Sequence, residues 1–258
     1  MSDTPPARPA PRKFDVLAAA ALTPNMLRVT LGGEGIAGFP AGQQGGYLKF
    51  RLDPLPGSDK PVVRTYTIRN QRADALDVDF ALHGAGDGVA GPATDWATSV
   101  TGGEAILAGG PGQAKPLPEG ADWYVVAGDM TALPAIGVNL ESLPRDARGV
   151  AVLEIQHEDD RQAIDAPAGV ELHWVVNPRP GTQPDLLADH LRSLGWHEGR
   201  VYGWVACEFT SMRELRAYLR EERGLGPADL YISSYWKSGA SEDAHKVIKR
   251  EDFEASAA

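Results

Sequence analysis

The stretch Trp123-Tyr124-Val125-Val126-Ala127-Gly128-Asp129-Met130-Thr131-Ala132 decides the fold of the second half of this 258-residue chain. Its first five residues form a near-continuous apolar run, which is typical of a strand covered on both faces. Gly128 to Ala132 then lead into a helix that we expect over residues 133–143. In a doubly wound sheet, this turn from strand to helix is the usual ligand crevice. We therefore predict a parallel sheet with a ligand at this end of its first strand.

Apolar strands and helical segments continue to alternate after this stretch. Further strands are expected at 150–155, 172–176, 201–206 and 230–234, and further helices at 186–194 and 212–222. This alternation indicates β-α-β units and a doubly wound parallel sheet. We assign residues 121–239 to this domain. Residues 240–258 carry cations at roughly helical spacing and form a C-terminal tail or helix, of which we prefer a solvated tail.

The first half of the chain has a different periodicity. Short alternating strands, separated by glycine and proline, are expected at 26–31, 47–52, 62–69 and 75–82. Such spacing predicts an antiparallel β-barrel. We assign residues 13–115 to the barrel domain, 116–120 to a linker and 1–12, rich in proline and alanine, to a disordered leader.

Composition narrows the possible partners. Lys and Arg number 25 against 35 Asp and Glu, and the formal charge of -10 argues against nucleic acid or an anionic membrane as a partner. A single cysteine, Cys207, excludes an internal disulfide, and no apolar run approaches the roughly 20 residues of a membrane helix. The six histidines are scattered, so no metal site is expected. We expect a cytoplasmic protein and take the monomer as the default.

Two motifs of the barrel half provide the groups needed to hold a flavin. In Arg64-Thr65-Tyr66-Thr67, the arginine suits a phosphate, the tyrosine offers a flat face and a hydroxyl to the flavin ring, and Thr67 suits the ring edge. Gly91-Pro92-Ala93-Thr94 resembles the first turn of a helix, whose unpaired amides favour a phosphate. Taken singly, the motifs also fit an exposed strand and an ordinary helix start. Together they indicate a flavoprotein.

The order of motifs along the chain resembles one family. The motifs are Arg64 to Thr67, His83-Gly84, Gly91 to Ala97, Ala108 to Gly112, Trp123 to Ile136 and Tyr235 to Gly239. This set is similar to the siderophore-interacting proteins, which are FAD-dependent ferric-siderophore reductases of the ferredoxin-reductase superfamily. The resemblance covers almost the whole chain after residue 13. It implies an N-terminal antiparallel FAD-binding β-barrel followed by a C-terminal doubly wound nicotinamide-binding domain.

The resemblance also implies an activity and a site. The expected activity is reduction of siderophore-bound Fe(III) to Fe(II) by NADH or NADPH through FAD, with no catalytic side chain and no metal ligand from the protein. For Asp129 and Thr131, simple capping of the following helix is the alternative role. The residues expected to bind the cofactors are Arg64, Thr65, Tyr66, Thr67, His83, Gly91, Pro92, Ala93, Thr94, Trp96, Asp129, Thr131, Ala132, Glu208 and Trp236.

An anionic ferric siderophore needs local cations in an acidic protein. The resemblance points to Lys49 and Lys237, and the tail adds Lys249 and Arg250 as candidates. Their alternative role is that of ordinary surface cations. Other functions also remain open: a flavin-dependent reductase with another electron acceptor, or a non-catalytic protein that binds ferric siderophore.

The choice of nucleotide depends on the segment after the second parallel strand. Acidic residues in His157-Glu158-Asp159-Asp160-Arg161 suit a free ribose hydroxyl and repel an extra phosphate, which favours NADH. Arg161 or Arg179 would instead suit the phosphate of NADPH. The family more often has glycine where this chain has Cys207, and we interpret that cysteine as structural.

Overall fold

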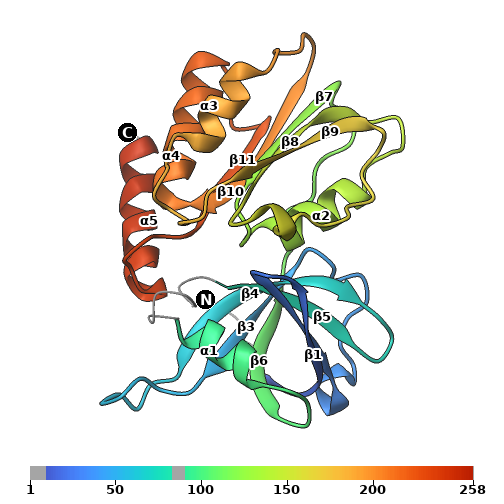
Figure 1. Ribbon diagram of the computed structural model, residues 1–258, viewed down its shortest axis with the longest axis vertical. Coiled ribbons are helices and arrows are strands. Elements are labelled where there is room, and N and C mark those ends of the chain that lie inside the picture. The colour runs from blue at the N-terminus through green and yellow to red at the C-terminus, as the bar shows by residue number, and fades with distance from the viewer. Residues whose placement is uncertain (1–9, 83–90, 258) are drawn as a thin grey trace, which may run out of the picture.

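The computed structural model describes residues 10–82 and 91–257. Two domains are stacked along its long axis, with a β-barrel at one end and a sheet flanked by helices at the other (Figure 1). His83, expected to bind flavin, lies outside the described residues. No helix in the described part of the chain is long and apolar enough to cross a membrane.

The first domain is a closed six-stranded barrel with the strand order β1-β2-β5-β4-β3-β6. Its strands are β1 (Arg12–Thr23), β2 (Met26–Gly32), β3 (Tyr47–Leu52), β4 (Val62–Gln71), β5 (Leu76–Ala81) and β6 (Ala105–Gly112). All the strand pairs are antiparallel. On β3, Leu48, Phe50 and Leu52 are buried in the barrel core, whereas Lys49 and Arg51 are exposed. This alternation of buried and exposed side chains is the pattern that predicts the barrel, and the antiparallel barrel is confirmed.

The second domain has a five-stranded parallel sheet with the order β11-β10-β7-β8-β9. Its strands are β7 (Trp123–Gly128), β8 (Arg148–Ile155), β9 (Gly169–Val176), β10 (Val201–Glu208) and β11 (Leu230–Trp236). The chain starts at the central strand β7, moves outward to β9, and then returns to the other side of β7. This reversal creates a switch point between β7 and β10, where ligands of such sheets bind. The predicted doubly wound sheet is confirmed.

Helices cover both faces of this sheet, which explains the continuous apolar strands. Val125, Val150 and Val205 pack in one core cluster with residues of α3 (Leu186–Ser193) and α4 (Phe209–Ala217). Tyr124, Ala151 and their neighbours pack on the opposite face in a second cluster with α2 (Leu133–Glu141). Each strand therefore buries its alternate side chains in two different cores.

Two helical segments differ from expectation. Helix α4 begins at Phe209, three residues before the expected start, because the Glu208 side chain accepts hydrogen bonds from two first-turn amides; a π-helical turn follows at Tyr218–Glu222. Residues Glu242–Ala257 form a 16-residue helix, α5, so the preferred interpretation as a solvated tail is wrong. The physical reason is that α5 buries His245 against the sheet, where Ser234 Oγ lies 2.8 Å from His245 Nε2.

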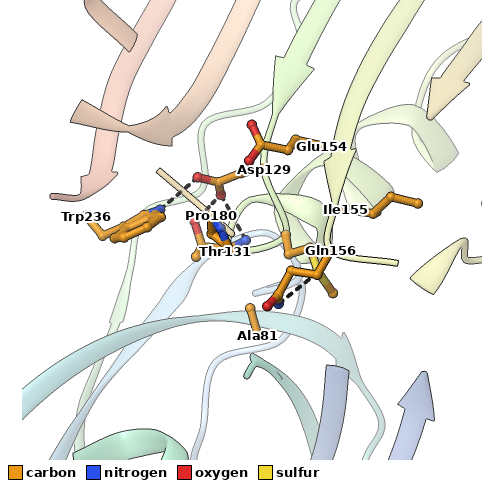
Figure 2. Close-up of a pocket in the computed structure, with 9 residues that line it drawn as sticks. Ala81, Asp129, Thr131, Glu154, Ile155, Gln156, Pro180 and Trp236 are labelled. Carbon is orange, nitrogen blue, oxygen red and sulfur yellow. Dashed lines mark hydrogen bonds between the residues drawn. The ribbon is translucent and has the colours of Figure 1, made fainter. Parts of the chain in front are cut away.

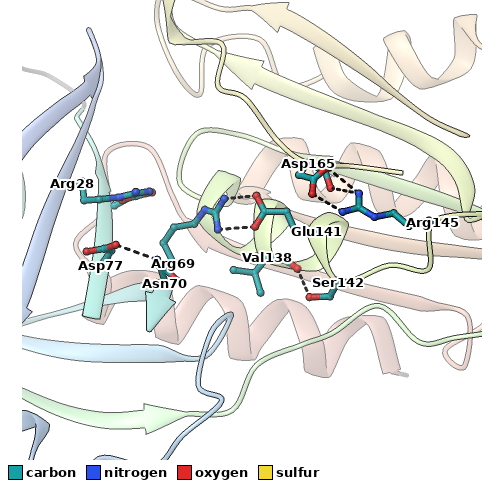
Figure 3. A network of polar contacts seen from close by, with 10 residues as sticks. Arg28, Arg69, Asn70, Asp77, Val138, Glu141, Ser142, Arg145 and Asp165 are labelled. Atoms are coloured by element: carbon teal, nitrogen blue, oxygen red, sulfur yellow. Dashed lines mark hydrogen bonds and ion pairs between the residues drawn. The ribbon is translucent and has the colours of Figure 1, made fainter. Parts of the chain in front are cut away.

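Polar contacts connect the two domains beside α2. Arg69, near the end of β4, donates two hydrogen bonds to the Glu141 carboxylate of α2 at 2.5 and 2.9 Å (Figure 3). Gln156, just after β8, donates to the backbone oxygen of Leu82 at 2.7 Å. Met26 of the barrel is fully buried in the core cluster of α2. The domains therefore share an apolar interface with polar contacts around it.

A buried carboxylate completes this connection. Asp160 is fully buried and accepts hydrogen bonds, each 2.8 Å long, from Thr23 Oγ1, from the Asn25 backbone and from Asn25 Nδ2. The backbone amide of His157, three residues earlier in the chain, donates a further hydrogen bond to the Asp160 carboxylate at 2.9 Å. Because Thr23 ends β1 and Asn25 lies in the turn that leads to β2, Asp160 attaches that turn to the second domain.

Candidate functional site

The predicted flavin motif lies on β4, at the edge of the barrel that faces the second domain (Figure 1). Arg64 lies opposite Phe50 in the strand register, and Tyr66 lies opposite Leu48. These two side chains therefore share the face of β4 that continues into the barrel core. Thr65 is on the other face of the strand, opposite Lys49.

Tyr66 belongs to an aromatic cluster. Its ring centroid lies 4.0 Å from that of Phe80 and 5.8 Å from that of Phe50. Trp96 of helix α1 (Pro92–Ser99) contacts the same Phe80 ring, with centroids 5.5 Å apart. Burial raises the pKa of the Tyr66 hydroxyl, which is therefore protonated and able to donate a hydrogen bond at neutral pH. The fold thus brings together two of the expected flavin residues.

Helix α1 starts as the sequence predicts. Gly91 is its N-cap in extended conformation, Pro92 is in its first turn, and no side chain caps it. The amides of Ala93 and Thr94 are therefore without a side-chain acceptor, which leaves donors and the positive end of the helix dipole for a phosphate. Both side chains are buried, so they hold this turn against the barrel core.

These donors fit a flavin pyrophosphate. The Arg64 guanidinium donates to the neighbouring Val63 oxygen at 2.9 Å and lies 4.0 Å from a Glu242 oxygen. It is only loosely paired, so it can still turn toward an anion. A guanidinium together with an uncapped helix start is the donor set that a diphosphate needs. The chemistry of the residues present therefore agrees with FAD on the barrel.

Asp129 organises the expected nicotinamide end, at the carboxyl edge of the sheet. Its Oδ1 accepts from the backbone and hydroxyl of Thr131 at 2.9 and 2.5 Å (Figure 2). Its Oδ2 accepts from the Glu208 amide at 2.8 Å and from Trp236 Nε1 at 2.7 Å. Burial raises the pKa of Asp129, while these hydrogen bonds oppose the shift. One carboxylate thus joins the ends of β7, β10 and β11.

The alternative role of Asp129 and Thr131 as helix caps is not what the structure shows. Ala132 is the N-cap of α2, without a side-chain hydrogen bond. The backbone amides at the start of α2 are consequently not taken by a side chain. Together with the crevice at the switch point, this start fits an anionic nucleotide.

Glu208 is one of the residues expected to bind a cofactor, and in the structure its side chain caps helix α4. Its carboxylate accepts from the amides of Thr210 and Ser211 and so occupies the start of α4. The other carboxylate oxygen accepts from the Ser238 amide at 3.1 Å, after β11. Glu208 therefore fixes the loop after β11, and its capping of α4 leaves the start of α2 as the uncapped helix end at this switch point.

A small pocket of about 20 Å³ opens between the domains beside Asp129 (Figure 2). Glu154 of β8 lines it, although the sequence analysis did not select this residue. Burial and repulsion by Asp129 raise the pKa of Glu154 to about 7, against an opposing hydrogen bond from Asn177 at 2.9 Å. The available signal is a single acidic residue within the strand, near the end of the otherwise apolar run from Gly149 to Ile155. The residues lining the pocket are Ala81, Asp129, Met130, Thr131, Glu154, Ile155, Gln156, Pro180 and Trp236.

The acidic residues after β8, which the sequence analysis relates to the ribose of the nucleotide, do not lie together in the structure. Asp160 is buried against the barrel and has no freedom to meet a ribose, which corrects the expectation for that residue. Glu158 and Asp159 are exposed, and Arg161 pairs with Glu158. Arg179 is exposed in the turn after β9, and within the described residues its side chain has no ion pair.

The four expected substrate cations lie in different settings. Lys49 is exposed, and its ammonium is 5.9 Å from the Tyr47 ring centroid. Lys237 is half-buried, 4.8 Å from the Phe209 ring centroid. Lys249 donates to Ser233 Oγ at 2.6 Å and to the Ser234 oxygen at 2.9 Å, so its ammonium attaches α5 to β11. Arg250 is exposed on α5.

Cys207 lies inside the second domain. It has no solvent exposure and belongs to the core cluster under α3 and α4. Burial raises the pKa of its thiol, and the nearby Asp129 and Glu154 carboxylates raise it further. Full burial and a raised pKa both disfavour the reactive thiolate, which agrees with the interpretation of Cys207 as a structural residue.

Comparisons with known proteins agree with this architecture. The family model described as "Siderophore-interacting FAD-binding domain" matches residues 50–115, and the one described as "Siderophore-interacting protein" matches residues 121–239. The ferric vibriobactin reductase ViuB of Vibrio cholerae is 34% identical over 267 residues, which cover 94% of this chain and 97% of ViuB.

Solved structures give the same result. The siderophore-interacting protein SipS from Aeromonas hydrophila superposes with a TM-score of 0.82 and 32% identity, covering 95% of this chain and 98% of SipS. A ferredoxin-NADP+ reductase from Plasmodium falciparum has a TM-score of 0.64 at 12% identity, covering 87% and 96% of the two chains, and so shares the fold alone. On its sequence, its two family matches and its fold, the chain belongs to the siderophore-interacting protein family.

Proposed function

We propose that this protein is an FAD-dependent ferric-siderophore reductase that uses a nicotinamide nucleotide as electron donor and acts in the cytoplasm. The observation that carries the proposal is the position of two helix starts without a side-chain cap, one on each of the adjoining domains, because such starts suit an anion. Arg64 and the uncapped start of α1 lie on the barrel, and the uncapped start of α2 lies at the switch point of the sheet. The name of the relative ViuB, a ferric vibriobactin reductase, supports the choice of substrate.

In this proposal, each domain orients one partner of the electron transfer. Arg64 and the first turn of α1 bind the flavin pyrophosphate, and Tyr66 and Thr67 orient the ring. Asp129 fixes Trp236 and the start of α2 for the nicotinamide half. Fixed positions matter because electron transfer between bound partners depends on their placement and not on a proton-transfer pair.

FAD, when bound, supplies a two-electron acceptor that gives up its electrons one at a time. The stoichiometry follows from charge balance. One hydride carries two electrons, so one NADH or NADPH reduces two ferric chelates to two ferrous chelates and leaves the oxidised nucleotide and one proton. Ferrous iron is held weakly by siderophores, so reduction itself releases it, and the protein needs no metal ligand.

We further propose that Lys49 and Lys237 attract the anionic chelate, while Lys249 serves to hold α5. The exposure of Lys49 on the face of β3 next to β4 supports this division. For the nucleotide we propose NADH, since Arg161 is paired with Glu158 and is not free for the additional ribose phosphate of NADPH. Arg179 is the other cation that suits the phosphate of NADPH, so it is the residue to substitute when activity with NADPH is tested.

An anaerobic absorbance titration tests the function. The protein reconstituted with FAD is titrated with NADH and separately with NADPH, and then receives a ferric siderophore and a ferrous-iron trap. Bleaching of the flavin, followed by recovery of its colour as trapped Fe(II) appears, is the expected result. A protein that binds no flavin contradicts the proposal and favours a ferric-siderophore-binding protein.

Two lysine variants test the substrate site in the same assay. Lys49→Ala and Lys237→Ala should raise the KM for an anionic ferric chelate and leave reduction of the flavin by nucleotide unchanged. Lys60→Ala, an exposed lysine in the loop between β3 and β4, is the matched control. Unchanged kinetics in both variants contradict the proposed roles of these lysines.

A further inference from the structure

One oxygen of the Glu154 carboxyl group has no partner in the described part of the chain. The residue is only 5% exposed, near the end of β8, and it lines the pocket between the domains (Figure 2). Its Oε1 accepts a hydrogen bond from Asn177 Nδ2 at 2.9 Å, whereas Oε2 has neither a hydrogen bond nor an ion pair among the described residues. Buried polar atoms generally have partners, so Oε2 is the atom that a ligand group in this pocket can satisfy.

The groups around Glu154 favour its protonated form. The charged side chains that act on it from the neighbouring strands are Asp129, which follows β7, and Glu208, at the end of β10. Burial, Asp129 and Glu208 raise the pKa of Glu154 to about 7, against the hydrogen bond from Asn177 after β9. The Cys207 thiol of β10 is also near, and its own raised pKa keeps it neutral. At pH 7, Glu154 therefore carries a proton in about half of the molecules.

The pocket admits one small group. Its volume of about 20 Å³ holds roughly one group of the size of water. Thr131, just before the uncapped start of α2, lines the same pocket, and the proposed function assigns the nucleotide to that start. A nicotinamide nucleotide has two kinds of small, uncharged oxygen-bearing group: the carboxamide and the ribose hydroxyls.

The two forms of Glu154 differ in what they offer such a nucleotide. A protonated carboxyl group donates an O–H hydrogen bond to an oxygen and adds no charge. A carboxylate can accept a hydrogen bond, but it adds a further negative charge beside Asp129 and Glu208, in a crevice that has to receive a pyrophosphate. The protonated form is therefore the one that suits the nucleotide.

We propose that Glu154 is a binding residue for the nicotinamide nucleotide, to which it donates a hydrogen bond from Oε2 as an uncharged carboxylic acid. The inference rests on the proposed function, in which the nucleotide binds at the start of α2. Binding holds the proton on Glu154, and the ionised protein must first take up a proton from the solvent. Affinity for the nucleotide therefore falls as the pH rises and Glu154 ionises.

Isothermal titration calorimetry of the FAD-reconstituted protein tests this role. The ligand is tetrahydro-NADH, an unreactive analogue that keeps the carboxamide and has no charge on its nicotinamide ring. Because the protonated fraction of Glu154 falls from about nine-tenths at pH 6 to about one-tenth at pH 8, we expect the wild-type dissociation constant to rise roughly tenfold. Titrations in buffers of different ionisation enthalpy should show uptake of about three-quarters of a proton at pH 7.5.

Two substitutions separate the hydrogen bond from the charge. Glu154→Gln keeps a donor and an acceptor but does not ionise, so it should bind the analogue at pH 8 as the wild type does at pH 6, without proton uptake. Glu154→Leu removes the hydrogen bond as well and should bind roughly threefold to tenfold more weakly than Glu154→Gln, again without pH dependence. Glu198→Gln, an exposed glutamate before β10, is the matched control and should keep the wild-type pH dependence.

ADP-ribose identifies the oxygen that Glu154 meets, because it lacks the nicotinamide. If its affinity depends on pH as that of tetrahydro-NADH does, the bond is to a ribose hydroxyl. If its affinity does not change with pH while that of tetrahydro-NADH does, the bond is to the carboxamide. Either result supports the role of Glu154.

Two results overturn the inference. One is a wild-type affinity for tetrahydro-NADH that is the same at pH 6 and pH 8, a measurement that needs no variant. The other is a Glu154→Gln variant that keeps the wild-type pH dependence. Failure of the proposed function gives a different result: an FAD-loaded protein that binds no tetrahydro-NADH at any pH contradicts the nucleotide site itself and, with it, the role of Glu154.

Discussion

The two ends of strand β4 meet the second domain in contrasting ways. At one end, Arg69 makes two short hydrogen bonds to Glu141 of α2. At the other end, Arg64 and Thr65 meet Glu242 at 4.0 and 3.4 Å. At the Arg69 end, the domains are joined by short hydrogen bonds between partly buried side chains. At the Arg64 end, the charged side chains are only loosely paired.

The difference shows how one strand can serve two purposes. Short, buried bonds hold the domains in a fixed relation, which two cofactors on different domains require. Loose pairing leaves a guanidinium available to a ligand, because little is lost when it turns away from its partner. Stability and binding are thus assigned to opposite ends of β4, and four variants test this division.

The largest effect is expected from Asp160→Ala. The substitution leaves the donors of Thr23, Asn25 and His157 without their fully buried acceptor. We expect a loss of about 3–5 kcal/mol in the free energy of unfolding, measured by urea denaturation with tryptophan fluorescence. Asp159→Ala, one residue earlier with 76% of its side chain exposed, should be unchanged. Equal stability of the two variants would show that Asp160 does not hold the domains together.

The second effect concerns Glu154, in the pocket between the two domains. Its pKa rises from the ordinary 4.5 to about 7 in the folded protein, so the folded state holds its proton more tightly than the unfolded chain does. This stabilisation is complete below pH 4.5 and is lost as the pH rises through 7, by roughly 3 kcal/mol. Glu154→Gln should therefore gain stability relative to the wild type between pH 5 and pH 8.5 in paired denaturation curves. A constant difference across this range contradicts the shift.

A moderate effect is expected from Arg69→Ala. The Arg69 and Glu141 side chains are 18% and 30% exposed, and their paired hydrogen bonds join the domains. We expect a loss of about 1–2 kcal/mol in the same denaturation assay. Arg145→Ala breaks a pair of similar geometry with Asp165, but within one domain and largely exposed (Figure 3). That control should show no measurable change; a loss as large as that of Arg69→Ala means that burial is not the cause.

The smallest effect on stability is expected at the Arg64 end. Glu242→Gln should change the free energy of unfolding by less than about 0.5 kcal/mol, because a long ion pair contributes little. The measurement is again urea denaturation, here without added flavin. A loss comparable to that of Arg69→Ala would show that both ends of β4 hold the domains together, and the contrast between them would disappear.

The fold follows from sequence patterns because they are local. Alternation on strands such as Tyr47–Leu52 predicts the barrel, and apolar runs such as Trp123–Gly128 predict the parallel sheet. The start of α1 at Pro92 was also predictable, since glycine and proline determine it within a few residues. Each of these features depends on neighbouring positions of the chain.

What sequence reasoning missed depends on contacts between distant positions. Asp160 looks like one member of an exposed acidic run, and only its meeting with Asn25, 135 residues away, makes it buried. Lys249 looks like a free cation on a helical tail until β11 takes its ammonium. Glu242 gave no local sign that it faces Arg64 from the other domain. Local spacing cannot show which domain surfaces come together.

The single thiol of the chain also makes the second domain chemically addressable by itself. Cys207 lies under α3 and α4 without solvent exposure, and the barrel has no cysteine. A thiol-reactive label can therefore modify the native protein only when the sheet domain opens. The labelling rate follows the opening of that domain alone and provides a kinetic clock that needs no engineered probe.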